Sequence, residues 1–229
     1  MAQSLAKPAS LSVVDVVTDW ILEGIHEGRY APGQRLVEAE ITQELGVSRG
    51  PLREAFRRLA ADGTLEIQAH RGAAVRRHSR TELAELFRVR EVLERLAARL
   101  AAERIDAPGV REKVLSMLKH IHKAGPHFDV EDHMEDNEIF HRTIFELSGN
   151  RFLQRVMTPL QMPTYRAAFF RLLKSANQKR SLDQHIAILE AIIAGKPDRA
   201  EAAMRKHVRE TEALSRKLSD VLFRPETAG

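Results

Sequence analysis

Apolar residues recur at intervals of three and four along the first part of the chain, a spacing typical of amphipathic helices. The first run extends from Val13 to Ile25, and Gly28 ends it. Similar patterns over about 37–45 and 49–61 predict two further helices, with Ser48 as a plausible N-cap of the last. The expected buried stripe of this third helix is Leu52, Ala55, Phe56 and Leu59.

The period of the pattern changes after Gly63. Apolar and polar residues alternate over 65–68, the sequence Ala-His-Arg-Gly interrupts them, and a small apolar run resumes over 73–75. This predicts two short strands joined as a β-hairpin with a glycine at its tip. Three helices followed by a hairpin are the order of a winged helix-turn-helix module.

From Thr81 onward the pattern is helical and shows no strand. The helical patterns lie over about 81–105, 109–123, 130–148, 151–176, 179–194 and 198–221. Pro159 and Pro163 are expected to kink or split the fourth of them, because proline lacks the amide donor that a helix interior needs. We therefore expect a bundle of six or seven helices, large enough to enclose a cavity.

The fold class expected from these patterns is mainly α, with an N-terminal winged helix-turn-helix that carries a small β-hairpin and a C-terminal all-helical bundle. The expected divisions are a flexible N-terminus, a winged domain, a helical domain and a C-terminal tail. Their bounds are 1–10, 11–78, 79–222 and 223–229.

Composition narrows the possible chemistry. The 229 residues are 43% hydrophobic and 30% charged, as in a soluble globular protein. The chain has no cysteine, which excludes a disulfide framework, a cysteine-based zinc module, an iron–sulfur cluster and a thiolate nucleophile. No stretch approaches the roughly 18 apolar residues of a membrane span, and the start of the chain does not resemble a signal peptide. We therefore expect no membrane partner and a cytoplasmic location.

Positive charge is concentrated in one segment. Residues 48–80 hold 8 basic and 3 acidic side chains, whereas residues 1–47 hold 3 basic and 7 acidic ones. A short basic segment beside an acidic one is what a surface for a polyanion looks like in sequence. The alternative is a solvated helix face without a partner.

The third predicted helix carries a row of arginines. Arg49, Arg53 and Arg57 are spaced by four and therefore share a face distinct from the apolar stripe. Such a helix fits the major groove of double-stranded DNA, where arginine recognises guanine. At the hairpin tip, Gly72 permits close backbone approach and Arg71 brings positive charge, which suits the minor groove. The alternative is that these arginines form surface pairs with Glu38, Glu44 or Glu54.

The segment GRYAPGQRLVEAEITQELGVSRGPLREAFRRLAADGTLEIQAHRGAAV resembles the N-terminal domain of the GntR family of bacterial transcription regulators. It has the family's Pro-Gly turn before Arg-Leu, then Leu-Gly-Val-Ser-Arg, Pro-x-Arg-Glu-Ala and the Arg-Gly of the wing. The resemblance implies that Arg35, Arg49 and Arg53 contact operator DNA and that Gly72 enters the minor groove. Thr64 and Gln34 depart from the family pattern at positions concerned with packing or capping.

Histidines supply the second candidate site. Asn137 and His141 lie one turn apart on a predicted helix, while His185 and His207 lie on two others. His133 is about 12 Å from His141 along the helix axis, too far to share an ion with it. Three imidazoles and one oxygen ligand in a bundle would leave a metal open to an external ligand. The alternative is that each histidine is a surface or satisfied interior residue.

The later sequence DNEIFHRTIFELSGN, followed by DQHIAILEAIIAGKPDRAEAAMRKHV, is similar to the FCD effector domain of the FadR subfamily of GntR regulators. The resemblance implies a divalent metal, commonly zinc or nickel, with a small carboxylate effector beside it. The implied ligands are Asn137, His141, His185 and His207. Asn137 replaces a frequent aspartate, so the site has one negative charge fewer and is expected to rely more on Glu138 or on the effector.

Arg90 occupies the position of an arginine that recurs in the first helix of that domain. It is a candidate for gripping the effector carboxylate in a bidentate manner. The alternative is a helix-surface pair with Glu94, four residues later.

The function expected is that of a ligand-responsive transcription regulator and not an enzyme. A homodimer would place two recognition helices about 34 Å apart on a short inverted-repeat operator. One alternative is a metal-dependent hydrolase tethered to DNA, with Glu138 or Asp183 as its base, although neither belongs to a recognised catalytic motif. Another is a metal that only braces the bundle.

Overall fold

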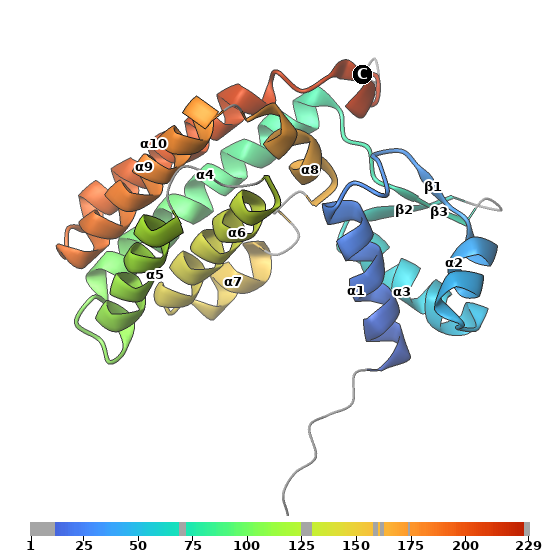
Figure 1. Ribbon diagram of the computed structural model, residues 1–229, viewed down its shortest axis with the longest axis horizontal. Coiled ribbons are helices and arrows are strands. Elements are labelled where there is room, and N and C mark those ends of the chain that lie inside the picture. Colours follow the sequence, from blue (N-terminus) through green and yellow to red (C-terminus); the bar gives the residue numbers. More distant parts are fainter. Residues whose placement is uncertain are drawn as a thin grey trace, which may run out of the picture. The chain divides into compact units, whose positions relative to one another are not determined.

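The computed structural model describes residues 12–68, 72–124, 130–157, 160, 163–173 and 175–226. The chain divides into two compact units, Met1–Arg76 and Arg77–Gly229, each of which is described by itself (Figure 1). The N-terminus expected to be flexible, residues 1–10, lies outside the described residues. In the parts of the chain that are described, no helix has both the length and the apolar character needed to cross a membrane.

The N-terminal unit is a winged helix-turn-helix, as the pattern predicted. Its elements are α1 (Val13–His26), β1 (Arg35–Leu36), α2 (Glu38–Leu45), α3 (Arg49–Ala61), β2 (Leu65–Gln68) and β3 (Gly72–Val75). The strands form an antiparallel sheet in the order β1-β3-β2, with Glu66 opposite Ala74 in the hairpin. Strand β1 was not predicted, because two residues are too few to show an alternating pattern.

The core of this unit lies where α1 packs against α3 and the sheet. The four residues expected on the inner stripe of α3 are all buried, and Ile21 of α1 and Leu65 of β2 join the same cluster. Gly46 ends α2 in the left-handed conformation, with φ of 63°, which glycine adopts without steric cost. Burial of this stripe holds α3 in one rotational setting, so its opposite face is held toward solvent.

The C-terminal unit is an all-helical bundle with seven α-helices among the described residues. They are α4 (Arg80–Glu103), α5 (Val110–Ala124), α6 (Val130–Leu147), α7 (Arg151–Met157), α8 (Pro163–Leu172), α9 (Ser175–Ile193) and α10 (Pro197–Ser215), followed by a 3-10 turn, Asp220–Leu222. The larger of the two expected numbers is therefore correct. The pattern over 151–176 forms α7, α8 and the start of α9, with Pro163 as the first residue of α8.

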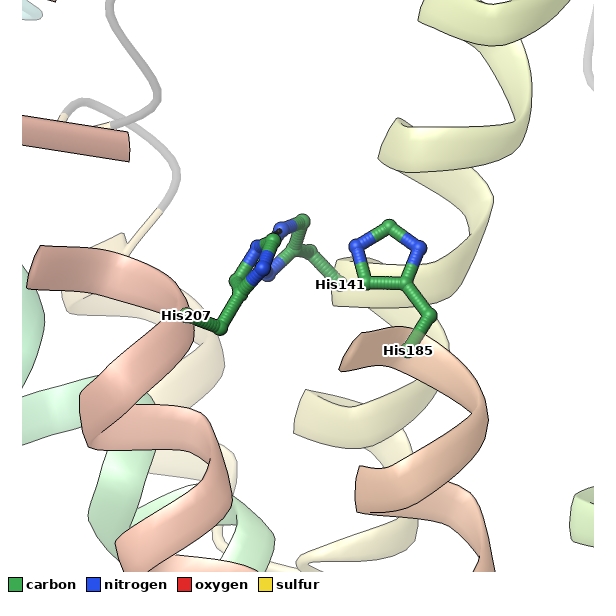
Figure 2. A group of neighbouring side chains, drawn as sticks. All are labelled: His141, His185 and His207. Carbon is green, nitrogen blue, oxygen red and sulfur yellow. Dashed lines mark hydrogen bonds between the residues drawn. The ribbon is translucent and has the colours of Figure 1, made fainter. Parts of the chain in front are cut away.

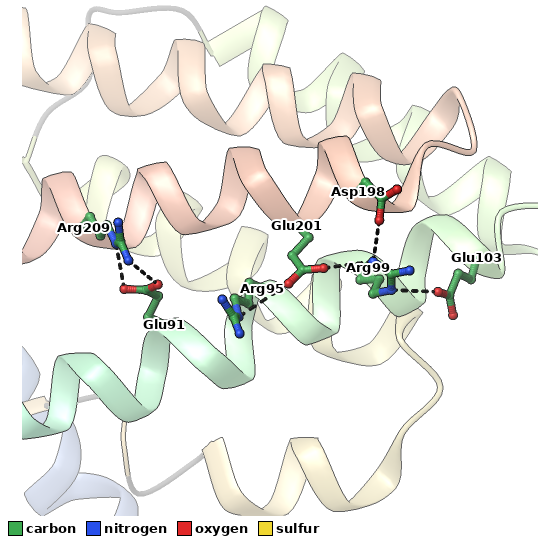
Figure 3. Close-up of polar contacts among 7 residues, drawn as sticks. All are labelled: Glu91, Arg95, Arg99, Glu103, Asp198, Glu201 and Arg209. Atoms are coloured by element: carbon green, nitrogen blue, oxygen red, sulfur yellow. Dashed lines mark hydrogen bonds and ion pairs between the residues drawn. The ribbon is translucent and has the colours of Figure 1, made fainter.

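Helices α4 and α10 run antiparallel along a seam that is bridged by ion pairs (Figure 3). Arg209 of α10 contacts Glu91 through two nitrogens at 2.9 and 3.1 Å. Nearer the other end, Arg99 reaches Asp198 at 2.6 Å and Glu201 at 3.0 Å. Exposed pairs of this kind contribute little stability individually. Their pairing order is the one that the antiparallel register requires.

The start of α4 is enclosed by the C-terminal segment. Phe223 is buried and stacks on Tyr165, with ring centroids 5.3 Å apart. The Arg224 amide donates to the carbonyl of His78, and Glu226 accepts from the amide of Thr81. The stretch expected as a tail, 223–229, is therefore packed as far as Glu226, and 227–229 lie outside the described residues. Buried Phe223 anchors this segment. A single aromatic residue does not form a periodic pattern, so the sequence did not predict this packing.

Replacement of Ser79 by alanine is expected to lower the stability of the helical unit by about 1 kcal/mol. Ser79 is the N-cap of α4, and its hydroxyl accepts from the amide of Glu82 while the Glu82 carboxylate accepts from the Ser79 amide. Thermal unfolding followed by circular dichroism measures the loss. The control is Ser48→Ala, because Ser48 caps α3 without a side-chain hydrogen bond. Equal losses in both variants would contradict the capping argument.

Candidate functional site

The outer face of α3 presents the arginine row that the sequence indicated. Arg49, Arg53 and Arg57 are all exposed, with 55% of the side chain accessible at Arg53 and 67% at Arg57. The buried stripe of α3 faces the opposite way. The helix therefore offers guanidinium groups to solvent on one side while the other side holds it in the fold.

Two of the three arginines also form the surface pairs considered as an alternative. Arg53 binds Glu38 through Nε and Nη2 at 3.0 and 3.1 Å, and Arg57 contacts Glu54 at 3.1 Å. Among the described residues, no ion pair includes Arg35 or Arg49. A phosphate or a guanine edge can replace the half-buried carboxylate of Glu38 as the partner of exposed Arg53, so this pairing is compatible with either interpretation.

The wing begins at Gly72, the first residue of β3. Its φ of 84° lies in the left-handed region, where any side chain would be strained. Strand β1 pairs with β3 with Arg35 opposite Ala74, which brings exposed Arg35 to the sheet that carries the wing. Arg71, the other predicted wing residue, lies outside the described residues.

The helical unit brings three of the predicted metal ligands together (Figure 2). His141 comes from α6, His185 from α9 and His207 from α10, and one nitrogen of each lies within 4.8 Å of the others. His185 and His207 are buried, and His185 stacks on Phe140 with ring centroids 3.8 Å apart. His133 is not in this cluster; it is buried edge-on against Phe170.

The partners of two of these rings determine where their protons lie. Nδ1 of His141 is 2.9 Å from Oε2 of Glu94 without the alignment of a hydrogen bond, and a carboxylate this close favours the tautomer with its proton on Nδ1. Gln184 donates its amide to Glu210 and thus presents its oxygen to Nδ1 of His207 at 2.9 Å, which places the proton there too. In both rings the lone pair is consequently on Nε2.

With these tautomers, the Nε2 lone pairs of His141 and His207 face each other. The Nε2 atoms of His141 and His207 are 3.3 Å apart, and Nε2 of buried His185 has no hydrogen-bond partner in the described part of the chain. Two facing lone pairs repel unless a cation lies between them. Two nitrogen ligands of a tetrahedral zinc ion, each about 2.0–2.1 Å from it, would lie roughly 3.3 Å apart. The donor set therefore fits a divalent metal.

Burial keeps the ligands in the form that binds metal. Burial, and secondarily the adjacent His141 ring, lowers the pKa of His207 to about 3. Burial also lowers the pKa of His185 well below its usual value. Both rings are thus neutral near pH 7, which metal coordination requires.

Glu94 joins the histidine cluster, which sequence analysis did not predict. Its side chain is fully buried, and it contacts both Arg90, at 2.8 Å, and His141. Burial alone would raise its pKa, but the charge of Arg90, with a smaller effect of the adjacent His141, outweighs burial and holds the pKa far below its usual range. The available signal was an acid on the apolar stripe of α4, between Phe87 and Ala101. A carboxylate bound to a histidine ligand orients that ligand toward the metal.

Arg90 forms the pair with Glu94 that was considered as an alternative, although the pair is buried and not on the helix surface. Nε and Nη2 both approach the same oxygen of Glu94, at 2.9 and 2.8 Å. Arg90 also lines the cavity beside the histidines. The structure thus places Arg90 at the site with part of its guanidinium already engaged.

A cavity of about 100 Å³ opens from the histidine cluster into the bundle. Asn137 and Glu138 line it together with His141 and His207. Asp183, the other carboxylate considered as a base, instead pairs with Lys179 at 2.8 Å on the exposed side of α9. The cavity admits an occupant larger than a single water molecule.

The far wall of the cavity is linked to the segment that follows β3. Tyr165 of α8 lines the cavity, and its hydroxyl oxygen accepts from the amide of His78 at 2.6 Å. The same hydroxyl donates to the His78 carbonyl at 3.3 Å. His78 directly precedes the N-cap of α4, so one side chain contacts both the cavity and the entry to the bundle.

Comparison with known proteins assigns both units. Residues 14–75 match the family described as bacterial regulatory proteins, gntR family, and residues 85–210 match the FCD domain. The chain is 32% identical over 201 residues to a probable D-xylose utilization operon transcriptional repressor of Paenarthrobacter nicotinovorans, with 86% of each chain covered. It is 26% identical over 191 residues to the HTH-type transcriptional repressor RspR of Escherichia coli (strain K12), with 82% of each covered.

Solved structures show the same fold. E. coli McbR/YncC aligns with a TM-score of 0.78 and 21% identity, covering 91% of this chain and 99% of that one. A putative transcriptional regulator GntR from Rhodococcus sp. RHA1 aligns with a TM-score of 0.71 and 23% identity, covering 90% and 98%. The names of the relatives point to transcription regulators and not to enzymes. With both units matched, this chain belongs to the GntR family of bacterial regulatory proteins, with an FCD domain after its winged helix-turn-helix.

Proposed function

We propose that this protein regulates transcription by binding an inverted-repeat operator as a homodimer, under the control of a small carboxylate bound at a metal in the helical unit. The observation that carries the proposal is the exposed arginine row on α3, held outward by the buried stripe behind it. A hydrolase would need a catalytic base, and of the two candidates only Glu138 lines the cavity. The names of the relatives give the hydrolase alternative no support.

The DNA-binding role divides among five residues. Arg49 and Arg53 reach the major groove from α3, Arg35 contacts the operator from β1, and Gly72 enters the minor groove with Arg71 beside it. On binding, Arg53 exchanges the carboxylate of Glu38 for DNA, so Glu38 serves to orient the guanidinium in the free protein. The exposed positions of Arg35, Arg49 and Arg53 support this assignment.

The effector site is built around the histidine cluster. Asn137, His141, His185 and His207 would hold a zinc or nickel ion, which when bound supplies positive charge for an effector carboxylate. Glu94 holds His141 in the required tautomer. Arg90 uses Nε and Nη2 for Glu94 and keeps Nη1 for the effector. The facing Nε2 atoms support the metal in particular.

An apolar stripe on α4 supports the homodimer. Val89, Val92 and Leu96 share one face of the helix and are 47%, 50% and 37% exposed. Exposed apolar stripes on a helix are typical of protein interfaces. A second copy of the chain that covers this stripe would pair the two bundles.

Replacement of Arg49 or Arg53 by alanine is expected to weaken operator binding by about ten- to a hundredfold each, because a bidentate contact to a base contributes about 1–3 kcal/mol. The operator is first selected from a pool of random duplexes, and affinity is measured by gel shift at fixed salt. Arg142→Ala in α6 removes the same charge from the other unit and is expected to leave affinity unchanged. Full operator binding by both α3 variants would refute the DNA-binding assignment.

Replacement of His207 by alanine is expected to abolish binding of one zinc or nickel ion per chain, and Glu94→Gln to weaken it ten- to a hundredfold. Elemental analysis after dialysis against each metal measures the content, with circular dichroism as the check on folding. His120→Ala is the control, since His120 is half-exposed and pairs with Asp136 away from the cluster. Undiminished metal content in His207→Ala would exclude the proposed ligand set.

Replacement of Val92 by aspartate is expected to convert the dimer into a monomer, because it places a charge at the centre of the apolar stripe. Sedimentation velocity at micromolar concentration measures the mass. Leu115→Asp on α5 is the matched control, since Leu115 is 48% exposed but lies on another helix. A Val92→Asp protein that stays dimeric would show that the interface lies elsewhere.

A further inference from the structure

The cavity changes from polar to apolar along its length. On α4 the lining residues run from Glu94 and Arg90 to Phe87 and then Leu83, in steps of three or four residues along one face. On the antiparallel α10 the lining runs from His207 through Thr211, and it ends beyond the helix at Leu218. Eleven residues of helix span about 16 Å, so the two ends are well separated.

The cavity is unusually rich in rings. Only 12 of the 229 residues are Phe, Tyr or Trp, yet five of them line this one cavity. They are Phe87, Phe145, Tyr165, Phe169 and Phe170. Two of them, Phe169 and Phe170, meet edge to face at 5.5 Å. Aromatic walls of this kind favour a flat apolar group in van der Waals contact over a hydrated chain.

The charges of the lining leave room for one negative group. Two arginines and three glutamates line the cavity, for a net charge of −1, and a divalent metal changes this to +1. Both arginines already have partners, Arg90 with Glu94 and Arg180 with Glu210 at 3.8 Å. With the metal bound, one carboxylate brings the charge of the lining to zero, whereas a second would make it −1 and leave its own desolvation uncompensated.

From this gradient we infer that the effector is a monocarboxylate with an apolar body about the size of an aromatic ring. The inference rests on the proposed function, because the metal at the histidine cluster is what receives the carboxylate. The ring lies against the aromatic side chains that line the cavity. Placed against these rings, a polyhydroxy acid of the same charge would bury hydroxyl groups that the rings cannot hydrogen-bond, which costs about 1–3 kcal/mol for each.

The test is calorimetric titration of the zinc-loaded full chain with four probes. Phenylacetate combines the carboxylate with a ring, phenylethanol has only the ring, gluconate has the carboxylate on a polyhydroxy chain, and succinate has two carboxylates. We expect phenylacetate to bind at least about tenfold more tightly than each of the others. Tighter binding of gluconate or succinate, or no binding of phenylacetate, would overturn the inference.

Two variants locate the ring. Phe169→Ala is expected to weaken phenylacetate about tenfold and to leave the affinity for acetate, which has no body, unchanged. Phe152→Ala is the matched control, because Phe152 is 77% exposed on α7 and does not line the cavity. Unaltered phenylacetate affinity in Phe169→Ala would also overturn the inference.

Failure of this inference is distinguishable from failure of the proposed function. If the chain holds zinc and binds its operator but prefers another probe, the proposed function stands and the ligand class is wrong. If the chain holds no metal, the charge balance disappears, and both the effector part of the proposed function and this inference are refuted.

Discussion

The helical unit is organised around one buried negative charge. Glu94 lies in the middle of α4 with no access to solvent, where an unpaired carboxylate would cost several kcal/mol. Arg90 neutralises it from one turn away, and His141 reaches it from α6. The nearby carboxylate of Glu94 thus favours the tautomer of His141 whose lone pair faces His207. The buried charge of Glu94 and the histidine cluster are therefore parts of one connected arrangement.

The winged unit follows a different principle. Its arginines on α3 are accessible because nothing in the unit buries them, while the buried apolar stripe fixes the rotation of the helix about its axis. Glu38 restrains Arg53 without desolvating it, so the guanidinium stays available for exchange. The polar groups around Glu94 in the helical unit are therefore buried and paired with one another, whereas the arginines of the winged unit are exposed on a fixed helix.

The sequence contained enough to predict most elements. The bounds of α3, residues 49–61, agree with the prediction, because Ser48 and the Asp62-Gly63 turn mark both ends. The hairpin and the convergence of His141, His185 and His207 also agree, the latter because the family resemblance supplied a relation between helices that spacing alone does not contain. Conversely, β1 is too short to show a period.

Other features depend on contacts between distant residues and leave little trace in local pattern. Glu94 looks like an ordinary partner of Arg90 until His141, 47 positions later, is placed against it. Gln184 acquires its role only because Glu210 orients its amide toward His207. The division of 151–176 into separate helices was foreseen only in part, since proline marks a break without determining its form.

Tyr165 ties helix α8 to the residue that precedes the N-cap of α4. Its hydroxyl uses both its donor and its acceptor on the backbone of a single residue, His78, and its ring is held between the cavity and Phe223. Helix α8 cannot slide past the start of α4 without losing both hydrogen bonds, each worth about 1 kcal/mol. A ligand that displaces α8 must therefore break these two hydrogen bonds or move the backbone of His78 with the helix. His78 lies three residues after the end of β3.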